Sequence, residues 1–382
     1  MFAPVAPPRP WRVAVAEPGP AGPGPAELGL LLACQNAADA ADRPGDSPTG
    51  LAELRSLLIP PYRGRRMLFT ALDPAGAAIG WARLGLYEAF HRSIGHGAVT
   101  VHPAARRLGV GSALVSAVAA ATREHGRSRL ILDAPRTAAT EGFARRHGLC
   151  VSGCDLRSRL DLAAPGLADR LAAARGAFPQ QHPRRRARPA ARGHADSGFS
   201  DTGFSDSGFS DSGFSGSSLS DVGFMGGGFM PVRWRSVCPD HLLEDYVRAL
   251  DSLHAKPGTA ESAPFTTSEI RYRESSAHVA GLREYTVCLI DPASGRIAAL
   301  SSAHTADGVR GEQNETVVVP EYRGRGLAAQ VKARLIEELL AAEPNLRVLD
   351  TYNAMDNHRM LAVNRRLGFR PLDAHAAWTL GL

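Results

Sequence analysis

A short pattern that joins an apolar run to a helix-forming segment occurs twice in this chain. The first copy spans residues 101–111 and reads VHPAARRLGVG, and the second spans residues 319–328 and reads VPEYRGRGLA. In both copies a proline lies three residues before the first arginine of the loop, Arg106 or Arg323, and Arg-x-x-Gly-x-Gly/Ala follows. Because a strand pattern precedes each loop and a helix pattern follows it, the repeat predicts two α/β units of the same kind.

The loop of the second copy has the composition of an anion-binding turn. Backbone N–H groups converge where a glycine-rich turn meets a helix N-terminus, and the helix dipole adds partial positive charge. The helix is predicted over residues 327–342, with apolar residues at helical spacing. The loop lacks both the GxGxxG spacing of dinucleotide-binding folds and the Lys-Ser/Thr of a P-loop. We therefore expect it to hold a phosphate group of another kind of ligand.

Composition restricts the class of protein. At 382 residues the chain suits two domains and a linker, and its 44% hydrophobic content can bury a core. The formal charge of +6 is compatible with an anionic ligand, and the five cysteines indicate a reducing compartment. We expect a cytoplasmic protein with no membrane segment, no metal site and no specific nucleic-acid partner.

The chain divides into parts at residues 1–162, 163–230 and 231–382. In the first part, strands are expected at 11–15, 67–72, 79–87, 97–102 and 129–133, with an edge strand ending at 162. Helices are expected at 26–41, 48–58, 109–125 and 137–147.

The middle part has a different composition. A basic, proline-rich stretch at 181–189 precedes a five-residue repeat of the type Ser-Gly-Phe-Ser-Asp at 197–215. One Phe per unit cannot bury enough area to offset the ordering of the backbone, so we expect a disordered linker. Its arginines could also contact nucleic acid, although a solvated linker fits the composition better.

The last part repeats the pattern of the first. Helices are expected at 242–254, 327–342 and 356–367, and strands at 284–290, 296–304, 315–319 and 347–352. Gly368 follows the last helix as its C-terminal stop.

Two loops of this type, each followed by helix, strand, helix and Gly-Phe/Leu, resemble the GNAT superfamily of acyl-CoA N-acyltransferases. The resemblance covers nearly everything outside the linker, and the segment Thr351, Asn353, Asn357, Met360, Asn364 and Leu367-Gly368-Phe369 is similar to an actinobacterial tandem type. It implies two GNAT-like domains, each a mixed, mostly antiparallel sheet flanked by helices. The first is expected to be degenerate and the second catalytic.

The resemblance also implies a binding site for acetyl-CoA. In GNAT folds the pantetheine lies where the fourth and fifth strands diverge, which places Thr316, Val317 and Val318 beside it. The pyrophosphate falls on the second loop, at Arg323, Gly324, Arg325, Gly326, Leu327 and Ala328. Asn353 and Asn357 could bind CoA or cap the last helix, for which Asp356 is another candidate. The corresponding residues of the first domain are Val101, Arg106, Arg107, Gly109 and Gly111.

The tyrosine that usually protonates the leaving thiol is missing from both halves. Its position is occupied by Asn364 in the second half and by Ala144 in the first, where Thr137 also replaces the family's asparagine. Asn cannot supply a proton at neutral pH. A water or Tyr352 could substitute, or the thiolate could leave unassisted, since a thiol pKa is near ~8.5.

Glu315 is the predicted general base, because several GNAT enzymes place a glutamate at the head of the fourth strand. The alternative is an exposed carboxylate at the strand end, and His304 is a weaker candidate for the base. The sequence thus predicts transfer of an acetyl group from acetyl-CoA to a primary amine by the second domain. The acidic residues Glu312, Glu315 and Asp350 favour a cationic acceptor. A non-catalytic acyl-CoA-binding or scaffolding protein is the alternative, and a monomeric pseudo-dimer or a homodimer is expected.

Overall fold

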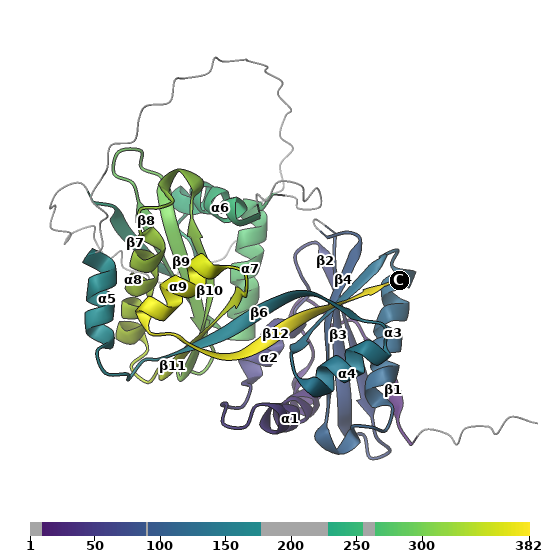
Figure 1. Cartoon of the computed structure of the whole chain (residues 1–382). Coiled ribbons are helices and arrows are strands. Elements are labelled where there is room, and N and C mark those ends of the chain that lie inside the picture. The colour runs from purple at the N-terminus through teal and green to yellow at the C-terminus, as the bar shows by residue number, and fades with distance from the viewer. Residues whose placement is uncertain (1–9, 89–90, 177–227, 255–263) are drawn as a thin grey trace, which may run out of the picture. The chain divides into compact units, whose positions relative to one another are not determined.

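The first half of the chain contains the strands and helices that its sequence predicts (Figure 1). The structure is a computed structural model, and it describes residues 10–88, 91–176, 228–254 and 264–382. The elements of the first half are β1 (Arg12–Ala16), α1 (Pro25–Asp42), α2 (Leu51–Leu58), β2 (Gly64–Leu72), β3 (Ala78–Tyr87), β4 (Ile94–Val101), the short turn η1 (Pro103–Ala105), α3 (Val110–Glu124), β5 (Arg129–Pro135), α4 (Ala138–Arg146), β6 (Cys150–Asp161) and α5 (Leu167–Gly176).

The second half repeats this order. Its elements are β7 (Met230–Arg235), α6 (Asp240–His254), α7 (Thr267–Ala280), β8 (Arg283–Ile290), β9 (Ile297–Thr305), β10 (Arg310–Val318), the short turn η2 (Pro320–Tyr322), α8 (Leu327–Ala342), β11 (Val348–Ala354), α9 (His358–Leu367) and β12 (Arg370–Gly381). Of these, α7, β7 and β12 were not expected from the sequence pattern. Helix α7 has no clear apolar stripe in its sequence, and it buries four residues.

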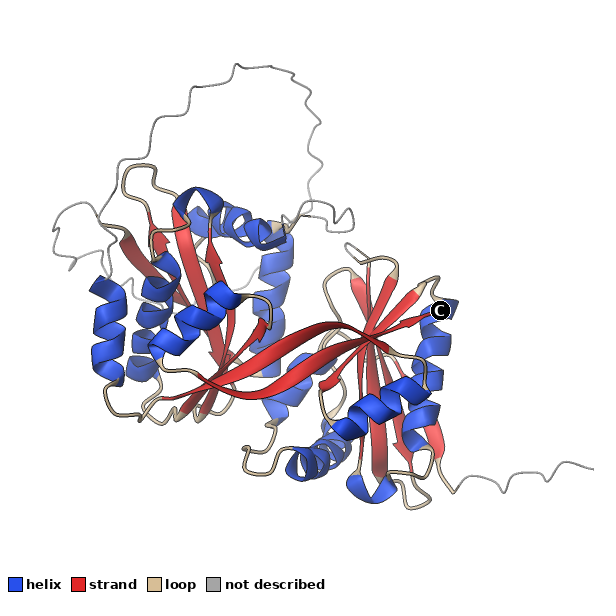
Figure 2. Ribbon diagram, in the orientation of Figure 1, coloured by secondary structure: helices blue, strands red, loops and turns tan. Residues whose placement is uncertain are grey.

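Within the described residues, the strands form one mixed sheet of 12 strands in the order β1-β2-β3-β4-β5-β12-β6-β11-β10-β9-β8-β7. Among the strands that the structure describes, the pairs β4–β5 and β10–β11 are parallel and the remaining pairs are antiparallel. Helices cover both faces of the sheet (Figure 2). The expected architecture, two α/β units with mixed and mostly antiparallel strands flanked by helices, is confirmed.

The two halves exchange their last strands. Strand β12, at the C-terminal end of the chain, pairs with β5 and β6 of the first half, and β6 pairs with β11 of the second half. Figure 1 shows β6 and β12 running side by side. The expectation of an edge strand ending at residue 162 is therefore wrong. That strand lies between two partners, because its pairing is decided by residues nearly 200 positions away.

A helix lies within the segment predicted as linker. Residues 167–176 form α5, which buries Leu167, Leu171 and Ala174 in the core beneath α8. Three apolar residues at helical spacing produce this packing, so ordered structure extends beyond residue 163. The five-residue repeat and the basic stretch lie outside the described residues. The division of the chain at residues 162 and 230 stays a prediction. Strands from the two sides of this division pair with each other, β6 with β11 and β12 with β5 and β6.

Each half has two core layers. In the first half, α3 packs on one face of the sheet, and α1 and α2 pack on the other through Leu28, Leu31, Leu54 and Leu58. In the second half, α8 and α5 cover one face, and α6 and α7 cover the other. No helix in the described ranges is long and apolar enough to cross a bilayer.

Candidate active site

The two repeated loops have the same backbone design. The guanidinium Nε of Arg106 donates to the carbonyl of Val101 over 3.3 Å, and Arg323 donates to Val318 over 3.1 Å in the same way. Each loop then ends in a glycine with positive φ at the helix N-cap, Gly109 at 82° and Gly326 at 76°. A residue with a Cβ is disfavoured there, so the turn that aims the helix N-terminus depends on glycine.

The second loop leaves its N–H groups available. Gly324 also has a positive φ of 80°, and no side chain caps the N-terminus of α8. Within the described residues, no backbone hydrogen bond takes up the N–H groups of residues 324–328. These are the positions predicted to hold the pyrophosphate: Gly324, Arg325, Gly326, Leu327 and Ala328. Free N–H groups at the positive end of a helix dipole fit an anionic phosphate.

Beside each loop the parallel strand pair opens. Residues 310–313 of β10 pair with residues 348–351 of β11, and the remaining residues of β10, including Thr316, Val317 and Val318, have no partner in β11. In the first half, residues 94–97 of β4 pair with residues 129–132 of β5, and the strand runs on to Val101 without that partner. The divergence gives an extended ligand room to use the free backbone edge of β10.

The second half has a β-bulge at this opening and the first half has regular pairing there. Gln313 pairs with Ala303 and Thr316 with Ser301, so Asn314 and Glu315 together face the single residue Ser302. The matching part of β4 pairs with β3 without a shift. Glu315 therefore lies at the bulge and not at the head of the strand, as the sequence suggested, because β10 begins five residues earlier, at Arg310. A bulge redirects the backbone and side chains at a site.

Glu315 is held as an anion by its neighbours. Its carboxylate accepts from Arg273 of α7 over 2.7 Å and from the Ser302 hydroxyl over 2.8 Å. Burial alone would raise the pKa of Glu315, but the charge and hydrogen bond of Arg273 lower it to about 2. A carboxylate with so low a pKa holds a proton only weakly at neutral pH. The role of Glu315 as general base stays a prediction.

Glu284 is a second carboxylate on the same face, which the sequence reading missed. It lies beside His304 across β8 and β9, and His304 lies beside Glu312 across β9 and β10. Burial raises the pKa of Glu284 to about 7; the charge of Arg273 opposes this rise and that of Glu315 adds to it. Burial also raises the pKa of Glu312. The only sequence signal for Glu284 was an acidic residue at the start of an apolar strand.

Three asparagines lie on β11 and α9, after the parallel pairing ends: Asn353, Asn357 and Asn364. The amide of Asn364, which occupies the position of the missing tyrosine, is 1% exposed and donates to Asn353 Oδ1 over 2.6 Å. Asn357 caps α9 by accepting from the N–H of Met360 over 3.2 Å. Tyr352 lies on the opposite face from Asn353, since neighbouring strand residues alternate, and burial raises its pKa to about 12.

The first half lacks these polar groups at the matching positions. Thr137 caps α4 through Thr140, and Ala144 is buried. Arg106 forms a two-bond ion pair with Asp42 at 2.8 Å, which occupies the guanidinium that would otherwise face a ligand. Arg107 has a positive φ of 67°, and a Cβ at Gly111 would lie 3.2 Å from Phe143. The first loop is thus built like the second but is more occupied by its own side chains.

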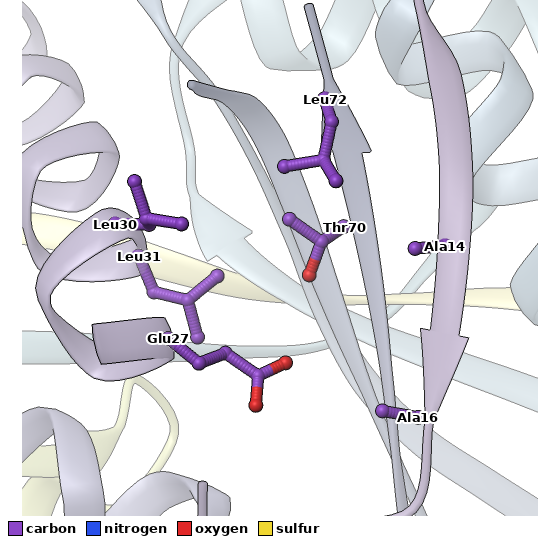
Figure 3. A pocket seen from close by; sticks show the side chains of 7 residues that line it. All are labelled: Ala14, Ala16, Glu27, Leu30, Leu31, Thr70 and Leu72. Carbon is purple, nitrogen blue, oxygen red and sulfur yellow. The ribbon is translucent and has the colours of Figure 1, made fainter. Parts of the chain in front are cut away.

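A pocket of about 120 Å³ lies elsewhere in the first half, between α1 and strands β1 and β2 (Figure 3). It contains none of the predicted site residues, and its lining is Ala14, Ala16, Glu27, Leu30, Leu31, Thr70 and Leu72. Figure 3 shows one carboxylate, that of Glu27, among mostly apolar side chains. This pocket lacks the chemistry expected of the transfer site. Within the described residues, no group of three His, Cys, Asp or Glu side chains could hold a metal ion.

Comparison with known proteins agrees with the repeated geometry. The family described as "Acetyltransferase (GNAT) domain" matches residues 64–148, and the one described as "Acetyltransferase (GNAT) family" matches residues 250–369. No curated protein sequence matches the chain.

Two solved structures share the arrangement over nearly the whole chain. The chain is 24% identical to a tandem GNAT protein from the clavulanic acid biosynthesis pathway, with a TM-score of 0.70 and coverage of 97% of this chain and 98% of that one. A GCN5-related N-acetyltransferase from Sphaerobacter thermophilus is 14% identical, with a TM-score of 0.62 and coverage of 98% and 96%. With one matched GNAT domain in each half and this shared fold, the chain belongs to the GNAT superfamily of acetyltransferases as a tandem protein.

Proposed function

We propose that the second half transfers an acetyl group from acetyl-CoA to a primary amine. The observation that carries this proposal is the bulge of β10 at Asn314 and Glu315. It lies beside the free backbone edge of β10, the open loop before α8 and a half-buried acidic face. The family supports acetyl transfer in general, and the choice of donor, acceptor and working half is ours.

Acetyl-CoA would be held mainly by backbone. The N–H groups at residues 324–328 suit the pyrophosphate, with Arg323 and Arg325 adding positive charge at the rim. Thr316, Val317 and Val318 would pair with the pantetheine along the free edge of β10. A backbone N–H near the bulge would then polarise the thioester carbonyl, which becomes negative as the amine attacks.

The acceptor would approach from the face that carries α6 and α7. Glu284, Glu312 and Glu315 lie on that face. Arg273 pairs with Glu315, and the charge of Arg310 acts on Glu312. Carboxylates in a half-buried site attract a protonated amine and disfavour an anionic one. This supports a small cationic amine or a basic peptide as the acceptor.

The amine must lose a proton before or during attack. Glu315 is the base predicted from the sequence, and its nearness to the bulge supports it. The pKa of about 7 supports Glu284 more strongly, because a base works best when its pKa lies near the operating pH. The thiolate would leave with a hydrogen bond from an amide of the Asn353–Asn364 pair or from water, since Asn cannot protonate it.

The experiment compares Glu284→Gln and Glu315→Gln in the full chain, with thiol release from acetyl-CoA measured over a panel of amines. The base variant should lose turnover by about 10² or more with little change in affinity for CoA. Glu244→Gln, an exposed change on α6, is the control.

Binding of acetyl-CoA without turnover on any amine would contradict the proposal. It would support the alternative, an acyl-CoA-binding protein without catalysis, which the loss of the thiol-protonating tyrosine favours.

A further inference from the structure

The two halves can be matched residue by residue on the face opposite α3 and α8. In both, the short parallel ladder has four pairs, and the third pair is His96–Ile131 in the first half and Glu312–Asp350 in the second. Across the sheet of the first half, His96 pairs with Gly85, and Gly85 pairs with Arg66. In the second half, Glu312 pairs with His304, and His304 pairs with Glu284. His96 therefore corresponds to Glu312, and Arg66 corresponds to Glu284.

The charge of this face is reversed between the halves. Arg66 takes the position of Glu284, and a histidine takes the position of Glu312. In the adjoining row, Arg83 takes the position of Ser302, the hydroxyl that binds Glu315. The face that would receive an amine in the second half is therefore basic in the first half.

Arg66 is buried without full pairing. Its side chain lies across Gly85, where a Cβ would come within 2.6 Å of Nη1, so the glycine makes the room for the guanidinium. The residue is 7% exposed, and Nε donates to the carbonyl of Ile59 at 3.4 Å. Among the described residues, neither Arg66 Nη1 nor His96 Nε2 has a hydrogen-bond partner. A buried donor that is left unpaired destabilises the folded state, and more so when the donor is charged.

The surroundings add positive charge. Burial, together with His91, Arg83, Arg129 and Arg66, lowers the pKa of His96 to about 4, so the imidazole is neutral and can donate one N–H. Burial also lowers the pKa of Arg66 to about 10; Arg83 adds to this shift, whereas the charge of Tyr87 and a hydrogen bond with it oppose the shift. The guanidinium stays charged at neutral pH. Asp133 of β5 is the carboxylate whose charge acts on Arg83. One carboxylate does not neutralise two guanidinium groups.

The cluster reaches the surface where the strands open. Arg83 and His96 are half-buried, and β4 leaves its pairing with β5 directly after residue 97. The rings of Tyr87 and His91 pack against His96 at centroid distances of 5.8 and 5.5 Å and form one wall. A small planar or tetrahedral oxyanion would find guanidinium donors on one side and aromatic edges on the other.

We infer that the first half carries a binding site for a small oxyanion, a carboxylate or a phosphate, formed by Arg66, Arg83 and His96. The site goes beyond the proposed acetyl transfer and does not depend on it. It gives the first half a ligand of opposite charge to the amine proposed for the second half.

The test is calorimetric titration of the full chain with acetate, succinate and inorganic phosphate, each at constant ionic strength set with chloride. We expect saturable binding of a carboxylate or of phosphate. Acetate and succinate report a carboxylate site, and inorganic phosphate reports a phosphate site. Arg83→Met should weaken that binding by about tenfold or more. Arg66→Met should do the same and should melt no lower than the unsubstituted chain, because it removes an incompletely paired buried cation.

Arg65→Met is the matched control. Arg65 is the next residue on β2, its side chain points to the other face, and it pairs with Glu17 at the surface. This variant should bind the anion as the unsubstituted chain does. Equal binding in all three variants, or no saturable binding of any probe, would overturn the inference.

Discussion

Arg273 of α7 donates to the carboxylate of Glu315 over 2.7 Å and thereby places a fixed cation on the acidic face of the second half. The same guanidinium lowers the pKa of Glu284, which burial alone would push higher. Arg273 thus acts on two carboxylates at once. It keeps one permanently ionised and leaves the other titrating near neutral pH.

Replacing Arg273 with Met should shift the pH dependence of acetyl transfer. Without the guanidinium the pKa values of both Glu284 and Glu315 rise, so the deprotonated base forms at higher pH. The rising limb of kcat/KM against pH should move up by about one unit, or about 1.4 kcal/mol. Arg271→Met, on the same helix but paired with Asp240 and Glu274, should leave the profile unchanged. An unchanged pH profile in Arg273→Met would show that neither Glu284 nor Glu315 is the general base.

Glu284→Gln should stabilise the protein above pH 7. The pKa of Glu284 is about 7 in the folded state against an ordinary 4.5, so the folded state binds the proton more tightly. Its contribution to stability therefore falls as pH rises from about 4.5 to 7, and ionisation costs on the order of 1–3 kcal/mol. Thermal melting at pH 8 should favour the glutamine variant, and the difference should shrink at pH 5. A variant that melts lower at pH 8 would contradict the assigned pKa.

Gly326→Val should weaken CoA binding by tenfold or more, about 1.4 kcal/mol, because a branched side chain fills the space that the pyrophosphate needs. Since Gly326 has a positive φ, the change also strains the backbone. Gly109→Val imposes the same strain at the matching position of the first loop. If the second half is the working one, only Gly326→Val combined with Arg323→Ala should abolish acetyl transfer. If acetyl transfer is lost only in the variant that combines Gly109→Val with Arg106→Ala, the first half is the working one.

Arg157→Met should destabilise the protein by about 3–5 kcal/mol, since it leaves buried carboxylates unpaired. Arg157 of β6 is 2% exposed and binds Asp46 at 2.7 Å and Asp373 of β12 at 2.5 Å. Although burial raises the pKa of Asp373, bonds from His375 and Arg157 lower it to about 2. This stability is present above the ordinary pKa of 3.8 and is lost as pH falls through about 2.

Chemical denaturation between pH 7 and pH 2 checks both points. The unsubstituted chain should lose stability steeply below pH 4, and Arg157→Met should lose less over the same range. Arg370→Met, an exposed change on β12, is the control. Equal pH dependence in the two proteins would show that Asp373 is held by His375 alone.

The sequence by itself determined the repeated units and the two loops. Local signals carry this information: the proline and arginine spacing, the glycine at the helix N-cap and the helical spacing after it all act within about a dozen residues. Helix α8 begins and ends where its pattern predicts, at Leu327 and Ala342. The order of strands and helices around each loop could be read for the same reason.

Only the tertiary structure decided how the strands of the two halves pair and which carboxylates face one another. Strand β6 has the same local pattern whether it lies at an edge or in the middle, and its place depends on Arg157 meeting Asp373, 216 residues away. The bulge at Glu315 likewise depends on Ser302 across the sheet. The sequence did not single out Glu284 or Arg66, because the pKa of each is shifted mainly by burial, which no local pattern encodes.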